Sequence, residues 1–217
     1  MNACIAKRIM LFGLALTAAV AIHGMRPRRQ TFYRAAYFLP TIVSVSVAGL
    51  LWRWLFNGEF GLLNALLKHV GVTVPWLTSE FWAMKSVVLM TLWWTLGGPT
   101  VILLAGLHQI PRQYYEAAAI DGASPRQQFL FITIPQLRPI LLFVSVMNII
   151  GSFQVFGQTF IITGGGPELS TRVLVQYIYE TAFRDFRMGY GAAISWLLFV
   201  CIGFFTVVQF LAMREKD

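Results

Sequence analysis

The sequence predicts an all-α protein, a polytopic transmembrane helical bundle, and two features of its composition support this prediction. Hydrophobic residues make up 57% of the chain and charged residues 12%, about half the charged share of an ordinary soluble domain. The apolar residues form five long blocks and do not alternate with polar ones, as the strands of a membrane barrel do. Because roughly 20 helical residues cross a bilayer, each block is expected to be one span of a single domain, 1–217. The five blocks are residues 9–24, 35–56, 82–107, 140–163 and 190–213.

The first block, 9–24, also fits a secretory signal peptide, since Lys7 and Arg8 precede it and small residues lie within it. The arginines that follow oppose that alternative, because such a cluster normally stays cytoplasmic: Arg26, Arg28, Arg29 and Arg34. With this cluster inside, the N-terminus lies outside, and the loop 108–139 and the C-terminus lie in the cytoplasm. The overall count of nine Lys and Arg inside against eight outside barely separates the two orientations.

Two further loops, about 58–81 and 164–189, are then expected on the outer surface. Each contains a short amphipathic stretch, 62–70 in the first and 174–183 in the second. Three glycines and Pro167 come directly after the fourth block and should end its helix, because neither residue type continues a helix cheaply.

The positions of the charged residues exclude several functions. All nine carboxylates lie outside the apolar blocks, which disfavours proton- and ion-coupled carriers, since these usually hold ionisable groups at mid-membrane. The sequence has no HExxH or GxSxG motif and no phosphate-binding loop, so we expect no catalytic residues, no metal site and no cofactor of its own. The basic residues are scattered between apolar blocks and form no continuous face, which argues against nucleic acid as a partner.

Neutral hydrogen-bonding residues instead form faces on two neighbouring blocks and predict a polar pathway for an uncharged, hydroxyl-rich solute. The third block has one such face, followed by Gly97, Gly98 and Pro99, which should weaken its helix. Interhelical hydrogen bonding is the alternative role for such residues. The candidate pathway residues are Thr91, Trp94 and Thr95 in the third block and Asn148, Ser152 and Gln154 in the fourth, with Gln158 on the stripe of Gln154.

The loop 108–139 is expected to contain two short helices. The first follows Pro111, spans about 114–123 and stops at Gly122, and the second is capped by Ser124 with Pro125 in its first turn. Alanines and acidic residues dominate the first helix, whereas a helix lying on the membrane surface would be basic and strongly amphipathic.

This loop carries a recognisable motif. Glu116-Ala117-Ala118, then Asp121-Gly122-Ala123, then the segment 132–135 ending at Pro135, resembles the EAA loop of bacterial ABC importer permeases. From Phe32 to the C-terminus the chain is similar to sugar permeases of the maltose and glycerol-3-phosphate type. The segments that carry this wider resemblance are 38–40, 52–57, 61–64 and 163–167.

The resemblance implies a permease subunit of the bacterial inner membrane that imports a sugar. Its EAA loop would lie in the cytoplasm and seat in an ATPase cleft, with Glu116 pairing to a basic group, Ala117 and Ala118 allowing close approach, and Gly122 making the turn. The implied partners are a second homologous permease, two ATPase subunits that bind ATP and Mg²⁺, an extracytoplasmic solute-binding protein and membrane lipid. A similar importer for glycerol phosphate or a polyamine is the main alternative, and a carrier or channel independent of ATP is a further one.

One departure from the family concerns the number of spans. The family usually has six core spans, and the first apolar block here resembles the family's second. We therefore expect the family's opening span to be missing from this sequence.

Overall fold

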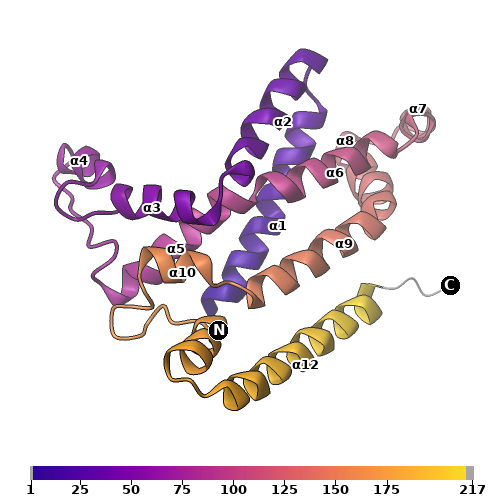
Figure 1. Cartoon of the computed structure of the whole chain (residues 1–217). Helices are drawn as coiled ribbons and strands as arrows, with labels where there is room; N and C mark the ends of the chain where they lie inside the picture. Colours follow the sequence, from indigo (N-terminus) through magenta and orange to yellow (C-terminus); the bar gives the residue numbers. More distant parts are fainter. Residues whose placement is uncertain (1, 214–217) are drawn as a thin grey trace.

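The computed structural model describes residues 2–213, with side chains from 10 to 212, and in this part of the chain every regular element is a helix. Figure 1 shows the helices as one bundle, with α4 and α7 at opposite ends. The α-helices are α1 (Asn2–His23), α2 (Pro27–Ile42), α3 (Val45–Leu55), α4 (Leu62–Lys68), α5 (Glu80–Thr95), α6 (Gly97–Gln109), α7 (Arg112–Ile120), α8 (Pro125–Gln128), α9 (Ile134–Phe153), α10 (Gly157–Ile162), α11 (Leu174–Tyr179) and α12 (Met188–Met213). Two π-helical turns complete them, η1 (Phe129–Thr133) and η2 (Glu180–Arg184).

The predicted all-α membrane bundle is confirmed. Among the described residues, two continuous helices, 125–153 and 188–212, are long and apolar enough to cross a membrane. Two bent helix pairs, α2 with α3 and α5 with α6, pass the same test when each pair is counted as one span.

Helix α1 lies in the core of the bundle. Ala15, Ala19 and Ile22 are almost fully buried against Leu103 of α6 and Leu137 of α9. These contacts make α1 part of the core of the bundle.

The apolar block 35–56 does not form one continuous helix. The chain instead forms α2 and α3, which meet at an angle of 95°. Val43 and Ser44 both have extended backbone (ψ 135° and 148°), and the Ser44 hydroxyl caps α3 by accepting a hydrogen bond from Val47 N. Pro40, inside α2, has no amide hydrogen to give to the preceding turn, which weakens the helix just before the break.

The third block bends where its glycines predicted. Helices α5 and α6 meet at 42° on either side of Leu96. The bend places Gly97 directly against α2, because a Cβ on Gly97 would lie 2.2 Å from Tyr37 O and 2.8 Å from Phe38 Cα. Only glycine therefore fits where these two bent spans meet.

The fourth block is displaced from its predicted bounds of 140–163. Helix α9 ends at Phe153, and the chain turns through Gln154 before α10. Toward the N-terminus, α9 is continuous with η1 and α8, so the second short helix expected in the loop 108–139 is the first turn of a 29-residue helix. Ser124 starts this helix with a capping box, in which Gln127 bonds back to the Ser124 amide.

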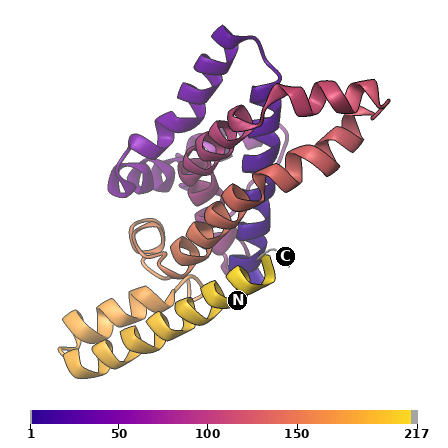
Figure 2. The ribbon, with the colours of Figure 1, turned by 90° about the vertical axis from the view of Figure 1, so that its right-hand side faces the viewer.

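The last block follows the prediction closely. Helix α12 begins two residues before the predicted Tyr190, and Figure 2 shows α11 and η2 lying alongside its first half. Asn64, which is 2% exposed, ties the loop 58–81 together through hydrogen bonds to Gly58, Val74 and Trp76. In the loop 164–189, Gln176 donates to Gly164 O at 2.9 Å and to Glu180, which also pairs with Arg172.

Candidate functional site

A cavity of about 310 Å³ lies at the bend between α5 and α6 and is also lined by α1, α9 and α10. Its volume falls at the lower end of the range for small-molecule sites. Four of the six predicted pathway residues line it: Thr91, Thr95, Asn148 and Ser152. The other lining residues are Leu11, Gly98, Pro99, Ile102, Phe143, Val144, Met147, Gly151 and Gln158.

The hydroxyl groups of the cavity share one arrangement. Thr91 donates to Val87 O, Thr95 to Thr91 O and Ser152 to Asn148 O, each at 2.7 Å and each within its own helix. A hydroxyl has one proton to donate and two lone pairs. The threonine and serine oxygens therefore meet a solute as hydrogen-bond acceptors.

The Asn148 amide supplies the complementary group. Its side-chain nitrogen is buried and has no hydrogen-bond partner among the described residues. A buried N–H group without a partner costs about 1–3 kcal/mol, so it is expected to have one in the working protein. In this cavity it can donate to an oxygen of a bound solute.

The structure places the other two predicted residues away from the cavity. The indole nitrogen of Trp94 donates to Val43 O at 2.8 Å, and its ring packs with the core of α3, α5 and α10. Gln154 is exposed in the turn after α9.

Gln158 lines the cavity from the first turn of α10 and is 8% exposed. It belongs to the same stripe of amides as Gln154 in the sequence. The turn between α9 and α10 decides which of the two points inward, and only tertiary structure shows that turn.

Helix α7 carries the EAA residues at an end of the bundle (Figure 1). Ala117 is exposed and Ala118 partly so, and Glu116 forms an exposed ion pair with Arg112 at 3.0 Å. Asp121 caps the helix, and Gly122 follows with φ +78°. The Gly122 and Ala123 amides donate to Ala119 O and Ala118 O, which is a Schellman motif that ends the helix in a tight turn.

Pro135 lies in the first turn of α9, after the π-helical turn η1. Tyr115 of α7 bonds to Thr133 of η1, with 2.8 Å between the two hydroxyl oxygens. The loop and the span that follows it are thus joined by a side-chain contact as well as by the chain.

Comparisons with known proteins identify the family of the chain. Residues 11–214 match the family described as binding-protein-dependent transport system inner membrane component. The lactose transport system permease protein LacF of Rhizobium radiobacter is 32% identical over 213 residues, covering 95% of this chain and 71% of LacF. The sulfoquinovosyl glycerol transport system permease protein SmoG of Agrobacterium fabrum is 34% identical over 209 residues, covering 96% of this chain and 66% of SmoG. The probable permease YurN of Bacillus subtilis is 36% identical, covering 88% of this chain and 66% of YurN, so the chain spans just under two thirds of several of these relatives.

The fold has a counterpart among solved structures. A chain of a bacterial ABC transporter for the acidic polysaccharide alginate superposes with a TM-score of 0.85 at 20% identity, covering 98% of this chain and 78% of that one. A chain of a bacterial alginate ABC transporter in complex with an alginate pentasaccharide-bound periplasmic protein gives a TM-score of 0.87 at 20% identity, covering 99% of this chain and 77% of that one. The chain belongs to the family of binding-protein-dependent transport system inner membrane components.

Proposed function

We propose that this chain is the translocation subunit of an ATP-driven importer for a neutral, polyhydroxylated solute of the sugar class. The family and the sugar permeases among its relatives support the class of transporter. The observation that carries the solute assignment is the buried, unpartnered amide of Asn148 in a cavity rimmed by hydroxyl oxygens. A sugar hydroxyl can accept from this amide and donate to the threonines at the same time.

The lining also bears on the charge of the solute. No Lys, Arg, Asp or Glu is among the side chains around this cavity. A phosphate ester would be expected to meet a basic group and a polyamine an acidic one, because an unpaired buried charge is costly. A neutral solute is therefore favoured over glycerol phosphate or a polyamine.

The test of the pathway is the variant Asn148→Ala in a complex reconstituted with its partner subunits. Loss of one hydrogen bond to the solute should lower uptake at limiting solute by about tenfold. Gln154→Ala is the matched control, because it removes an exposed amide from the end of the same helix and should leave uptake unchanged. Equal uptake by both variants would remove Asn148 from the pathway.

We further propose that α7 is the segment that contacts the ATPase subunits. Its exposed alanines allow a close approach, and its turn depends on Gly122, whose positive φ a proline cannot adopt. In the same reconstituted complex, Glu116→Ala combined with Gly122→Pro should lower uptake and solute-stimulated ATP hydrolysis together.

Glu59→Ala, which changes an exposed carboxylate in the loop at the opposite end of the bundle, is the control for that variant. If the α7 variant keeps both activities, the coupling role is refuted. Uptake by vesicles that lack ATPase subunits and ATP would instead indicate a channel or a secondary carrier.

A further inference from the structure

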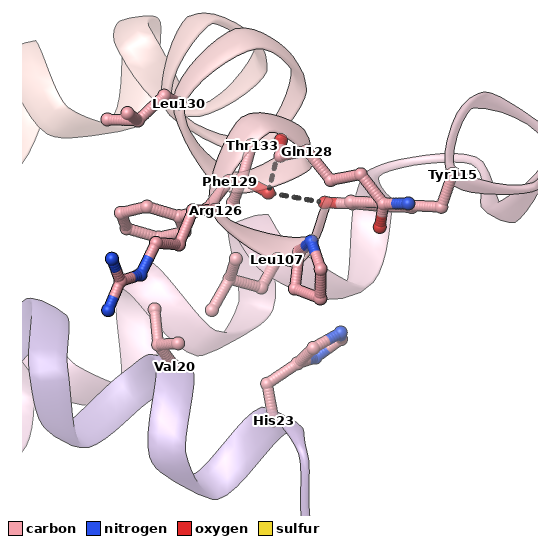
Figure 3. A pocket seen from close by; sticks show the side chains of 10 residues that line it. Val20, His23, Leu107, Tyr115, Arg126, Gln128, Phe129, Leu130 and Thr133 are labelled. Atoms are coloured by element: carbon pink, nitrogen blue, oxygen red, sulfur yellow. Dashed lines mark hydrogen bonds between the residues drawn. The ribbon is translucent and has the colours of Figure 1, made fainter. Parts of the chain in front are cut away.

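A second cavity, of about 620 Å³, lies at the end of α1 and shares no lining residue with the first. Its walls are the last turns of α1 and α6 on one side and α8 with η1 on the other (Figure 3). It therefore separates the membrane helices from the segment that leads out of the EAA loop. The residues that line it are Val20, His23, Leu107, Tyr115, Pro125, Arg126, Gln128, Phe129, Leu130 and Thr133.

The cavity has an apolar wall and a basic rim. Val20, Leu107, Phe129 and Leu130 form the apolar part, and Figure 3 shows the Arg126 guanidinium above Val20, beside the Phe129 ring. No carboxylate lines the cavity, and across residues 10–212 Arg126 has no ion-pair partner. A cation over an apolar surface suits a ligand that is both anionic and hydrophobic.

His23 adds a ring N–H donor to the lining of the cavity, and His108 packs behind it. The His23 ring packs edge to face on His108, with 4.9 Å between the ring centroids. His108 Nδ1 lies 2.7 Å from Leu104 O, so the Nδ1–H tautomer donates to that carbonyl and leaves Nε2 as the other polar atom of the ring. His23 lines the cavity and has no carboxylate contact among the described side chains.

The position of the cavity relative to the spans favours a lipid over a soluble anion. His23 is the last residue of α1 and His108 the next to last of α6, so the cavity opens where both helices leave the apolar region. The arginine cluster 26–34 follows His23 directly in the chain and adds positive charge beyond this end of α1. Basic pockets between helices at this depth are the usual binding sites for anionic headgroups.

We propose that this cavity binds one anionic phospholipid of the inner leaflet. Its phosphate lies between Arg126 and His23, and one acyl chain follows Val20, Leu107, Phe129 and Leu130. The assignment to the inner leaflet rests on the proposed function, which places the EAA loop in the cytoplasm. The bound lipid contacts α1 and α6 on one side and α8 and η1 on the other, and so braces the start of the loop-linked helix against the bundle.

The test measures lipids retained by the complex, purified with its partner subunits into nanodiscs of equal parts phosphatidylcholine and phosphatidylglycerol. Native mass spectrometry should show phosphatidylglycerol retained in preference to phosphatidylcholine. Arg126→Gln should weaken this preference by about fivefold, the effect of one arginine near a membrane surface. Arg126→Lys, which keeps the positive charge, should retain most of the preference for phosphatidylglycerol.

Arg29→Gln is the matched control, because Arg29 is an exposed arginine of the nearby cluster that does not line the cavity. If Arg29→Gln and Arg126→Gln lower the preference for phosphatidylglycerol equally, the lipid is attracted to basic residues in general and the proposal is overturned. The proposal is also overturned if the wild-type complex shows no preference for phosphatidylglycerol, which is the result expected if a protein segment fills the cavity. Displacement of the lipid by the same concentration of inorganic phosphate would assign the site to a free anion instead.

The lipid assay needs neither ATP nor solute, so its result is independent of the uptake experiments. Cysteine accessibility at Ala119, an exposed residue of α7, tests the side of the membrane separately. Modification of Ala119→Cys only from the outside would refute the proposed orientation while leaving the lipid site itself intact.

Discussion

The two bent spans of this protein, α2 with α3 and α5 with α6, differ in how the backbone passes through the bend. At the 42° bend the helical hydrogen bonds continue, because Leu96 N donates to Leu92 O at 3.0 Å and Thr100 N to Leu96 O at 3.3 Å. At the 95° break, Val43 and Ser44 are extended and the ladder stops. The first is a bend within a helix, and the second is an interruption.

An interruption at membrane depth requires other partners for the freed backbone groups. Val43 O receives the indole N–H of Trp94, from a residue 51 positions away, and Val47 N donates to the Ser44 hydroxyl. Each bent span thus supports the other, since Trp94 and Gly97, on the two sides of the milder bend, both contact the α2–α3 segment. Three substitutions test this mutual dependence, in order of expected effect.

Gly97→Ala should be the most damaging. The new Cβ would lie 2.2 Å from Tyr37 O, so backbone must move, at a cost of about 3 kcal/mol or more. Equilibrium unfolding in mixed detergent micelles measures this loss. Gly98→Ala is the control, because a Cβ there meets no atom within 4 Å and should stabilise the helix by up to about 1 kcal/mol. Equal stability of the two variants would mean that the spans are not packed at Gly97.

Trp94→Phe keeps an aromatic ring but removes the donor to Val43 O. We expect the free energy of unfolding to fall by about 2 kcal/mol, the cost of leaving that carbonyl without its partner. The solute KM should be unchanged, because Trp94 does not line the cavity. Trp93→Phe, which changes the more exposed neighbouring ring, should alter neither the free energy of unfolding nor the solute KM. A raised KM with normal stability would instead restore Trp94 as a residue that contacts the solute.

Ser44→Ala should have the smallest effect. Loss of the N-cap of α3 is expected to lower the unfolding free energy by about 1 kcal/mol. Ser79→Ala is matched to it, because Ser79 precedes α5 but makes no capping hydrogen bond, and should change stability by less than about 0.5 kcal/mol. A loss of several kcal/mol at Ser44 would show that the cap alone maintains the break.

The helix ends, caps and bends that depend on nearby residues could be predicted from the sequence. The bend at Gly97, the end of α10 before Gly164, the Ser124 cap and the extent of α12 all appeared close to their predicted positions. The break at Val43 was missed although Pro40 and Ser44 are local signals for it, because the partner that stabilises the break, Trp94, is distant in the chain. The end of α9 was missed for a similar reason, since apolar residues continue through the turn that follows it.

For the candidate site, the sequence indicated which residues share a helical face but not which faces turn toward the cavity. Helical spacing brought Thr91 with Thr95 and Asn148 with Ser152 onto common faces, and the structure brings the two pairs together. Spacing gave no way to choose Gln158 over Gln154, because the turn after α9 rotates one inward and leaves the other exposed. It also could not distinguish a Trp94 ring that meets solute from one that supports backbone.

The unbroken helix from Pro125 to Phe153 has a mechanical consequence. Asn148 lies about 35 Å along its axis from Ser124, at about 1.5 Å per residue. A stiff rod of this length pivots as a unit, so a small tilt applied at its capped end would be delivered to the amide in the cavity with little loss. The Ser124 capping box lies at the end where that tilt would be applied, and the π-helical turn η1 and Pro139 are the places along the helix where it would bend most easily.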